Sequence, residues 1–166
     1  MKIALYDHYL DTLGGGERYM LTAAACLARQ HNITVFWDDK NVLGKAHDKF
    51  NLDLNDVTVA ENIFSSHKPF LKRAFDTQKY DVILFLSDGS IPFLFSKKNI
   101  LLIQFPVNWV NGRSLINQIK LKKINKVICY SDFVKTYLDK TFNTATQVLY
   151  PPVVQIGAKD EEKENI

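Results

Sequence analysis

Short apolar runs alternate with amphipathic stretches along most of the chain, and this pattern predicts strands that alternate with helices. Most of the apolar runs are continuous, as is typical of strands that are covered on both faces. The predicted strands cover residues 2–6, 33–37, 57–60, 81–86, 100–104, 126–130 and 147–149. The predicted helices cover residues 17–31, 70–77, 114–123 and 132–140, and Ser131 is the expected N-cap of the last one.

The alternation of strands and helices indicates a parallel sheet with right-handed crossovers. We therefore expect an α/β fold, a Rossmann-like parallel sheet of about seven strands with helices on both faces. Residues 1–154 would form this domain. Pro151 and Pro152 disfavour a helix or a central strand, and the chain turns polar beyond Val154. Residues 155–166 are therefore predicted to be a polar acidic tail or the start of an interdomain linker.

The composition fits one globular domain. Of the 166 residues, 46% are hydrophobic and 23% are charged, which excludes a mainly disordered chain. No apolar run approaches the ~20 residues of a membrane-spanning helix, and the N-terminus lacks the pattern of a signal peptide. Cys26 and Cys129 lie far apart in apolar segments. We expect both to be buried free thiols in a reducing compartment, with the cytoplasm as the default.

The net charge of +3 combines a mildly basic body with an acidic tail, residues 159–166. This level of charge does not by itself indicate nucleic-acid binding, and no nucleic-acid partner is expected. The basic residues of the body either form solvated faces or are attracted to an anionic membrane leaflet or a lipid pyrophosphate at the cytoplasmic membrane face. They are Lys68, Lys72, Arg73, Lys97, Lys98, Lys120, Lys122, Lys123 and Lys126. The stretch FLKRAF, residues 70–75, is the one expected nearest a membrane.

Polar residues follow most of the predicted strands. Ligands of parallel sheets bind at the carboxyl ends of the strands, so these residues form a candidate binding edge. For any single residue, an ordinary polar surface loop is the competing interpretation. The residues are Asp7, His8, Asp38, Asp39, Glu61, Asn62, Ser87, Asp88, Gly89, Gln104, Tyr130 and Ser131.

The stretch TLGGGERYM, residues 12–20, places three consecutive glycines between a predicted strand and a predicted helix. A helix N-terminus has unpaired N–H groups and a partial positive charge, and glycine lets a phosphate approach the backbone closely. A phosphate-binding loop therefore competes with a tight turn in which Glu17 is a favourable first-turn acid. A P-loop is excluded, because Glu17 and Arg18 stand where Lys and Ser or Thr are required.

A dinucleotide-binding fingerprint fits this stretch only in part. Gly14 and Gly16 match the first two glycines of G-x-G-x-x-G, but Tyr19 occupies the third position. Asp38 or Asp39, at the end of the second predicted strand, sits where a ribose-binding acid would stand. A nicotinamide-dinucleotide-binding oxidoreductase domain therefore stays open as an alternative, as does a stand-alone binding module.

The stretches GGGER, YSDF and VLYPPV, at residues 14–18, 130–133 and 148–153, follow one another in an order that resembles a known family. It is the N-terminal domain of the retaining GT-B glycosyltransferases of family 4, also called group 1, and GGGER is most similar to the mannosyltransferases that extend lipid-linked oligosaccharides. The resemblance covers residues 1–154. It implies two Rossmann-like domains that face each other across a cleft, the C-terminal one holding most of the nucleotide-sugar. The chain would then be the acceptor-side half of a hexosyltransferase, a fragment or truncated product that is inactive alone.

The resemblance also implies roles for single residues. Gly14, Gly15 and Gly16 would approach the donor diphosphate, and Glu17 would fix the loop or the start of the helix. The stretch ILLIQFPVNW is similar to a family segment with His-Phe-Pro, but here Gln104 replaces the histidine and cannot carry a proton near neutral pH. The expected acceptor-side residues are His8, Asp88, Gly89, Gln104 and Ser131.

The expected partners are a nucleotide-sugar, a glycan or lipid-linked acceptor and the C-terminal domain. The nucleotide-sugar is a substrate, and no cofactor is expected. The 4 histidines and 2 cysteines show no metal-ligand spacing, so no metal is expected either. No hydrolase motif is present, and the catalytic residues are left unassigned. The phenylalanines and tyrosines are interpreted as core.

Overall fold

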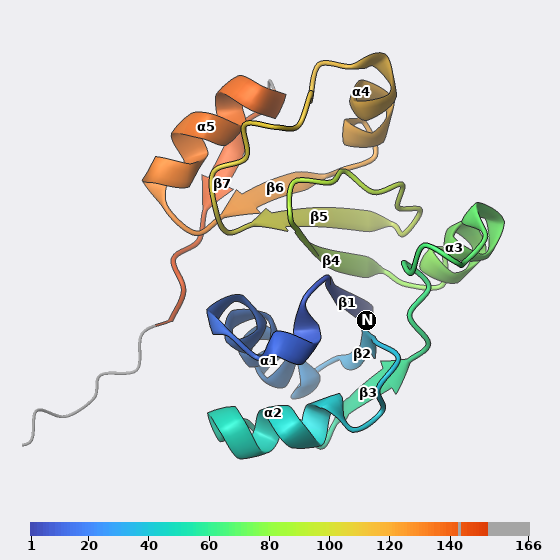
Figure 1. Cartoon of the computed structure of the whole chain (residues 1–166). Coiled ribbons are helices and arrows are strands. Elements are labelled where there is room, and N and C mark those ends of the chain that lie inside the picture. Colours follow the sequence, from blue (N-terminus) through green and yellow to red (C-terminus); the bar gives the residue numbers. More distant parts are fainter. Residues whose placement is uncertain (143, 153–166) are drawn as a thin grey trace, which may run out of the picture.

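The computed structural model describes residues 1–142 and 144–152. Within these residues, seven parallel strands form one sheet: β1 (Lys2–Asp7), β2 (Asn32–Phe36), β3 (Val57–Ala60), β4 (Val82–Ser87), β5 (Lys98–Ile103), β6 (Lys126–Cys129) and β7 (Thr146–Val148). The helices are α1 (Gly15–Ala28), α2 (Val42–Phe50), α3 (Phe70–Thr77), α4 (Leu115–Leu121) and α5 (Asp132–Phe142), with a single 3-10 turn, η1 (Leu10–Thr12) (Figure 1). The predicted α/β fold with a Rossmann-like parallel sheet is confirmed.

The strand order is β3-β2-β1-β4-β5-β6-β7, which places β1 and β4 side by side in the middle of the sheet. Ala4 of β1, for example, lies opposite Thr34 of β2 and Ile83 of β4. The chain adds β2 and β3 on one side of β1 and then β4 to β7 on the other. The direction of winding therefore reverses between β1 and β4, which is where parallel sheets of this kind bind their ligands.

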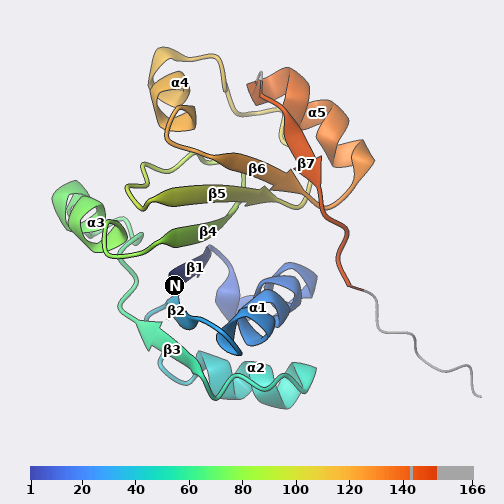
Figure 2. The same ribbon diagram turned by 180° about the vertical axis from the view of Figure 1, so that it is seen from behind.

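Helices and loops cover both faces of the sheet, which explains why the strands are continuously apolar. On one face, Met20 of α1 and Ala46 of α2 belong to a core that includes Leu5 of β1. On the other face, Leu138 and Phe142 of α5 pack in a second core. Figures 1 and 2 show α1 and α2 together on one side of the sheet and α5 on the other. Helices on both faces are thus confirmed as well.

Two local features differ from the sequence-based expectation. The hydrophobic pattern does not predict α2, because this helix buries only Val42 and Ala46 and contains Gly44, a residue that disfavours helix. The first helix begins at Gly15 and not at Glu17, because Gly14 is extended and serves as the N-cap while Glu17 reaches back to it from inside the first turn.

The expected burial of side chains is corrected at several positions. Cys26 is exposed and Cys129 is buried, and both thiols are free. Cys26 lies outside the buried stripe of α1, so an apolar segment did not guarantee burial of each of its residues. Several phenylalanines and tyrosines, which the sequence predicts to be core residues, are also exposed: Phe70, Phe75, Phe133, Tyr137 and Tyr150.

The C-terminal segment predicted as an acidic tail or linker, residues 155–166, lies outside the described residues, as do the last two residues of the predicted domain. Within the described ranges, none of the helices has the length and the apolar character needed to cross a lipid bilayer.

Candidate functional site

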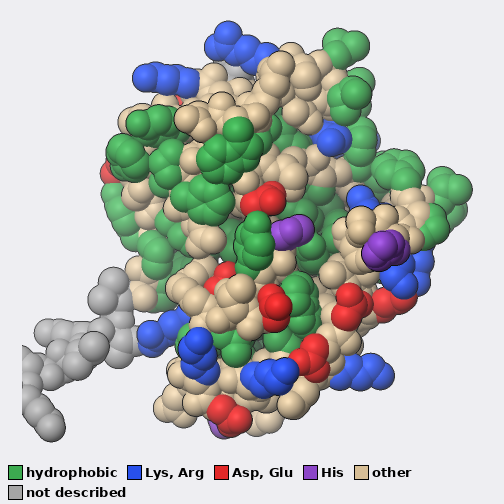
Figure 3. Space-filling view, viewed as in Figure 1, with side chains coloured by type: hydrophobic (Ala, Val, Ile, Leu, Met, Phe, Trp, Pro, Cys, Tyr) green, Lys and Arg blue, Asp and Glu red, His purple; other side chains and the backbone are tan. Residues whose placement is uncertain are grey.

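The loops that follow β1 and β4 leave the sheet toward opposite faces. The β1 loop leads into α1 on the first face, whereas Ile91 and Leu94, which follow β4, pack in the core of the second face. Between such diverging loops the carboxyl edge of the sheet is left uncovered, and ligands of doubly wound sheets bind in that crevice. In Figure 3 a histidine and several carboxylate side chains lie near the middle of the face shown, in the region where these loops approach each other in Figure 1.

The glycine loop is held by a carboxylate from its own helix. The side chain of Glu17 accepts hydrogen bonds from the backbone N–H of Gly14 and from the hydroxyl of Thr12, 3.1 Å away. The turn before it places Leu13 in the left-handed region with a φ of 49°. Glu17 is buried, so these bonds are shielded from water and fix where α1 begins. One of the three glycine amides is therefore used inside the protein.

The other two glycine amides lie at the N-terminus of α1, where Gly15 is exposed and Gly16 is buried. Among the described residues, the N–H groups of Gly15 and Gly16 have no acceptor. A Cβ atom at Gly15 would meet nothing within 4 Å, so the space beside this exposed residue is open. A Cβ atom at Gly16 would lie 2.3 Å from Oε1 of Gln104. The structure therefore brings Gln104, at the end of β5, against the glycine loop, and that approach requires a residue without a side chain at position 16.

Asp7, the last residue of β1, is a buried carboxyl group directly behind this loop. Its side chain is 2% exposed, its Oδ1 accepts a hydrogen bond from the N–H of Tyr9, and its Oδ2 has no partner among the described residues. Burial raises the pKa of Asp7 to about 7, and the negative charges of Glu17 and Asp11 act in the same direction. Near neutral pH this carboxyl group is therefore partly protonated and can donate a hydrogen bond.

Tyr130, at the end of β6, is a second polar group that lacks a partner. Its ring packs on Tyr19 of α1 with a centroid distance of 4.4 Å, and its buried hydroxyl has no hydrogen-bond partner in the described part of the chain. Burial, followed by the proximity of Tyr19, Asp7 and Glu17, raises the pKa of Tyr130, so the hydroxyl stays neutral. Buried polar groups are normally satisfied, so Asp7 and Tyr130 are two unmet hydrogen-bonding sites close to one helix N-terminus.

His8 and Asp88 are neighbouring polar residues that follow β1 and β4. The hydroxyl of Tyr6 lies 3.3 Å from Nδ1 of His8. Partial burial by itself raises the pKa of Asp88, but hydrogen bonds from Ser90 and the charge of His8 outweigh it and bring the pKa below its ordinary value. Asp88 is therefore an ionised hydrogen-bond acceptor at the switch point between β1 and β4.

Gly89 allows the loop of residues 107–110 to lie directly on the end of β4. Its φ is +111°, a conformation that favours glycine, and a Cβ atom here would lie 3.1 Å from Nε1 of Trp109. Trp109 stacks on Phe105 with a centroid distance of 5.9 Å and is largely exposed. An exposed indole therefore lies at the candidate site, although the sequence analysis did not select it.

Ser131 and the acids after β2 have other partners. The Ser131 hydroxyl accepts a hydrogen bond from the N–H of Val134, 3.3 Å away, and thus caps α5. Ser131 follows β6, and β4 and β5 separate that strand from β1. Asp39 forms an ion pair with Lys45 at 2.8 Å, and Asp38 accepts a hydrogen bond from the N–H of Asn62.

The sequence selects the glycines, Glu17 and Gln104 individually. It also places Asp7 and Tyr130 on the candidate binding edge, because both follow strands, but assigns neither a role. Trp109 is missed, because its place beside Gly89 depends on how the loop folds back. The contact between Gly16 and Gln104 is not predictable from the sequence, since the two residues lie far apart along the chain.

Four hollows on the described part of the surface lie away from the glycine loop. One of about 270 Å³ lies beside Ala25, Cys26 and Asn51, and another is lined by Glu61 and Lys72. Within residues 1–142 and 144–152, no group of three or more His, Cys, Asp or Glu side chains is arranged to hold a metal ion. The candidate site is therefore an open edge of the sheet that offers backbone amides, an amide side chain, carboxyl groups and an indole.

Comparisons with known proteins do not identify a family for this chain. No protein-family model matches the chain, and no curated protein matches its sequence.

Proposed function

We propose that the chain is the N-terminal, acceptor-binding domain of a retaining GT-B glycosyltransferase, which moves a sugar from a nucleotide-sugar to a glycan or lipid-linked acceptor. The observation that carries the proposal is the α1 N-terminus at the switch point. There the N–H groups of Gly15 and Gly16 have no acceptor in the described residues, and Gln104 packs directly against Gly16. The stretches GGGER, YSDF and VLYPPV resemble this class of enzyme, and GGGER forms the N-cap and first turn of α1.

The donor side of the proposal rests on the free amides. A diphosphate oxygen can accept a hydrogen bond from the N–H of Gly15, an exposed residue whose N–H has no acceptor in the described residues, and the partial positive charge of the helix terminus favours the anion. The carboxylate of Glu17 is close by and weakens this attraction. Strong binding of the diphosphate therefore requires cationic groups from a second, donor-binding lobe, which also stabilise the leaving diphosphate during transfer.

The acceptor side rests on neutral and charged hydrogen-bonding groups at the same edge. Gln104 offers both a donor and an acceptor, and ionised Asp88 offers acceptors, as sugar hydroxyl groups require. His8 lies beside Asp88 and adds a further polar contact. The exposed face of Trp109 offers an apolar surface on which a sugar ring can pack. These hydrogen-bonding side chains and the exposed indole suit an acceptor that carries hydroxyl groups better than an acceptor that is purely apolar.

The oxidoreductase alternative has less support from the geometry. A third glycine would let a dinucleotide-binding helix pack closely against the sheet, but Tyr19 is buried at that position and packs on Tyr130. Asp39 is engaged by Lys45, and Asp38 by the N–H of Asn62. Neither acid is therefore free in the way that recognition of a ribose requires.

Titration of residues 1–166 with ligands, followed through Trp109 fluorescence in a Trp37→Phe background, tests the proposal. We expect weak, saturable binding of a nucleoside diphosphate sugar such as GDP-mannose or UDP-glucose, and no tighter binding of NADH. Gly15→Asp introduces a negative charge into open space at the first turn of α1 and should weaken donor binding at least tenfold. Gly15→Ala keeps the N–H group uncovered and serves as the matched control.

Three results would contradict the proposal. They are tighter binding of NADH than of any nucleotide-sugar, equal donor affinity of Gly15→Asp and Gly15→Ala, and sugar transfer by residues 1–166 alone. The last result would refute the requirement for a second lobe, because the leaving diphosphate would then need no further cationic groups.

A further inference from the structure

Helices α3 and α4 expose their apolar side chains to solvent. Leu71 and Phe75 are each 66% exposed, and Leu115 is 81% exposed. None of the α4 residues is buried, and Thr77 is the buried residue of α3. We call the surface formed by the apolar residues of these two helices the α3–α4 face: Phe70, Leu71, Phe75, Leu115, Ile116 and Ile119.

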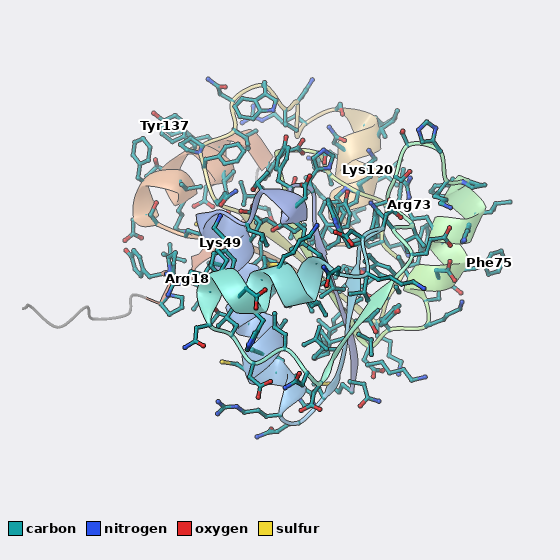
Figure 4. All side chains as sticks on the ribbon, turned by 60° about the horizontal axis from the view of Figure 1, so that its bottom comes forward. Arg18, Lys49, Arg73, Phe75, Lys120 and Tyr137 are labelled. Atoms are coloured by element: carbon teal, nitrogen blue, oxygen red, sulfur yellow. The ribbon has the colours of Figure 1, made fainter. Side chains whose placement is uncertain are left out.

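The two helices are linked through one aromatic ring. Phe70 of α3 packs edge-on against Phe93, with a centroid distance of 5.6 Å, and Nζ of Lys120 on α4 lies 5.2 Å from the centre of the same ring. Figures 1 and 2 both show α3 and α4 on the same flank of the molecule. Figure 4 labels Phe75 and Lys120 on this flank and Tyr137 at the opposite end. The α3–α4 face is therefore one surface built on two helices.

This flank is basic. From residue 89 to residue 131 the chain contains no Asp or Glu. Lys122 and Lys123 are exposed, and no described residue forms an ion pair with either of them or with Lys120. The basic residues in this range are Lys97, Lys98, Arg113, Lys120, Lys122, Lys123 and Lys126.

The charge on the α3 side is mostly compensated. Glu61 forms ion pairs with Lys68 and Lys72, and Lys79 pairs with Asp76. Arg73 turns inward and donates a hydrogen bond to the carbonyl of Ile63. The uncompensated positive charge of the face therefore comes from α4 and the residues after it, next to exposed Leu115, Ile116 and Ile119.

We infer that the α3–α4 face docks on an anionic phospholipid surface, its apolar side chains entering the headgroup region while the lysines after α4 contact lipid phosphates. Exposed leucine, isoleucine and phenylalanine next to lysine are the residues that interfacial helices use for this purpose. A second copy of the chain fits less well, because a two-fold contact through this face would bring the unpaired lysines of both copies together. The inference depends on this surface alone and not on the proposed transferase activity.

Sedimentation of residues 1–166 with vesicles tests the inference. We expect binding to vesicles of 70% phosphatidylcholine and 30% phosphatidylglycerol, and at least tenfold weaker binding to pure phosphatidylcholine, since each lysine near an anionic surface contributes about fivefold in affinity. The double variant Leu71→Ser/Phe75→Ser removes apolar area from α3 and should weaken binding at least tenfold. The triple variant Lys120→Gln/Lys122→Gln/Lys123→Gln should do the same on anionic vesicles and abolish the preference for them.

Matched controls carry equal changes at positions away from the face. Phe133→Ser/Tyr137→Ser removes two exposed aromatic side chains from α5, and Lys40→Gln/Lys49→Gln/Lys140→Gln removes the same charge. Both controls should bind anionic vesicles like the wild type, and circular dichroism of all variants shows whether each one folds.

Each other outcome overturns the inference. Absence of wild-type binding, equal binding to neutral vesicles, or equal losses in the variants and their controls would each do so. So would a dimer in light scattering that the Leu71→Ser/Phe75→Ser variant abolishes, with no vesicle binding. Donor binding measured through Trp109 does not involve this face, so the two proposals can fail separately.

Discussion

Replacing Asp7 by Asn tests whether a buried, partly protonated carboxyl group lies behind the glycine loop. Asp7 is almost fully buried, and its Oδ2 has no partner among the described residues. Burial, together with the charges of Glu17 and Asp11, raises its pKa from the ordinary value of 3.8 to about 7, although the hydrogen bond from Tyr9 opposes the shift. A carboxyl group that resists ionisation in the folded state makes folding depend on pH.

Below pH 3.8 the group is protonated in both the folded and the unfolded chain, and it imposes no pH-dependent penalty. Between pH 3.8 and pH 7 the unfolded chain loses a proton that the folded protein retains, so the free energy of unfolding falls as the pH rises. At about 1.4 kcal/mol per pKa unit, the penalty reaches about 4 kcal/mol above pH 7, of which about 2 to 3 kcal/mol develops between pH 5 and pH 8.

Urea unfolding of the wild type and of Asp7→Asn at pH 5 and pH 8 measures this penalty. Asn keeps the shape of the side chain and does not ionise. With a denaturant slope of about 2 kcal/mol/M, the wild-type midpoint should fall by about 1 M more than that of the variant. Asp48→Asn, an exposed change on α2, should follow the wild type. Equal pH dependence of the wild type and Asp7→Asn would refute the assignment of a raised pKa to Asp7.

Two further changes test the packing around the loops. Glu17→Ala removes the acceptor of the Gly14 N–H and should lower the free energy of unfolding, measured with urea, by about 1 to 2 kcal/mol. Glu17→Gln should lose less. Equal stability of Glu17→Ala and the wild type would show that the cap contributes nothing. Gly112→Ala would place a Cβ atom 2.4 Å from the carbonyl oxygen of Thr141 and should lower the free energy of unfolding by about 1 to 3 kcal/mol. Gly15→Ala, where a Cβ atom meets nothing within 4 Å, should be neutral or mildly stabilising. Similar urea midpoints for the two variants would contradict the close packing at Gly112.

The sheet could be predicted from the sequence because its strands are covered on both faces. A continuous apolar run such as residues 82–86 leaves little choice other than a buried strand, and the alternation of seven predicted strands with helices implies the parallel sheet. Helix α2 was missed for the opposite reason. It buries two of its residues, and its stability comes from contacts with the rest of the core that a local pattern does not contain.

The candidate site could be predicted as a set of residues but not as an arrangement. Strand ends and the glycine run identify the edge of the sheet, since they are local features of the sequence. The contact of Gln104 with Gly16 joins two loops that are separated by most of the chain, and the protonation of Asp7 depends on how completely the fold removes water from it. The exposure of Cys26 depends in the same way on which side of α1 faces the sheet.

The charges around α1 explain why this loop is better suited to sharing a ligand than to holding one alone. Glu17 stabilises the loop by accepting the Gly14 N–H, but its negative charge lies at the helix terminus that would attract a phosphate, and it also raises the pKa of Asp7. A terminus that was selected only for stability would not need Gly15, because alanine is the better helix former and position 15 has room for a side chain. Gly16, in contrast, is required by its contact with Gln104. An exposed Gly15 beside a stabilising acid is a compromise between a rigid loop and an accessible one. Such local conflicts are typical of places where a fold binds a ligand, and under the proposed function the remaining positive charge would come from a second lobe.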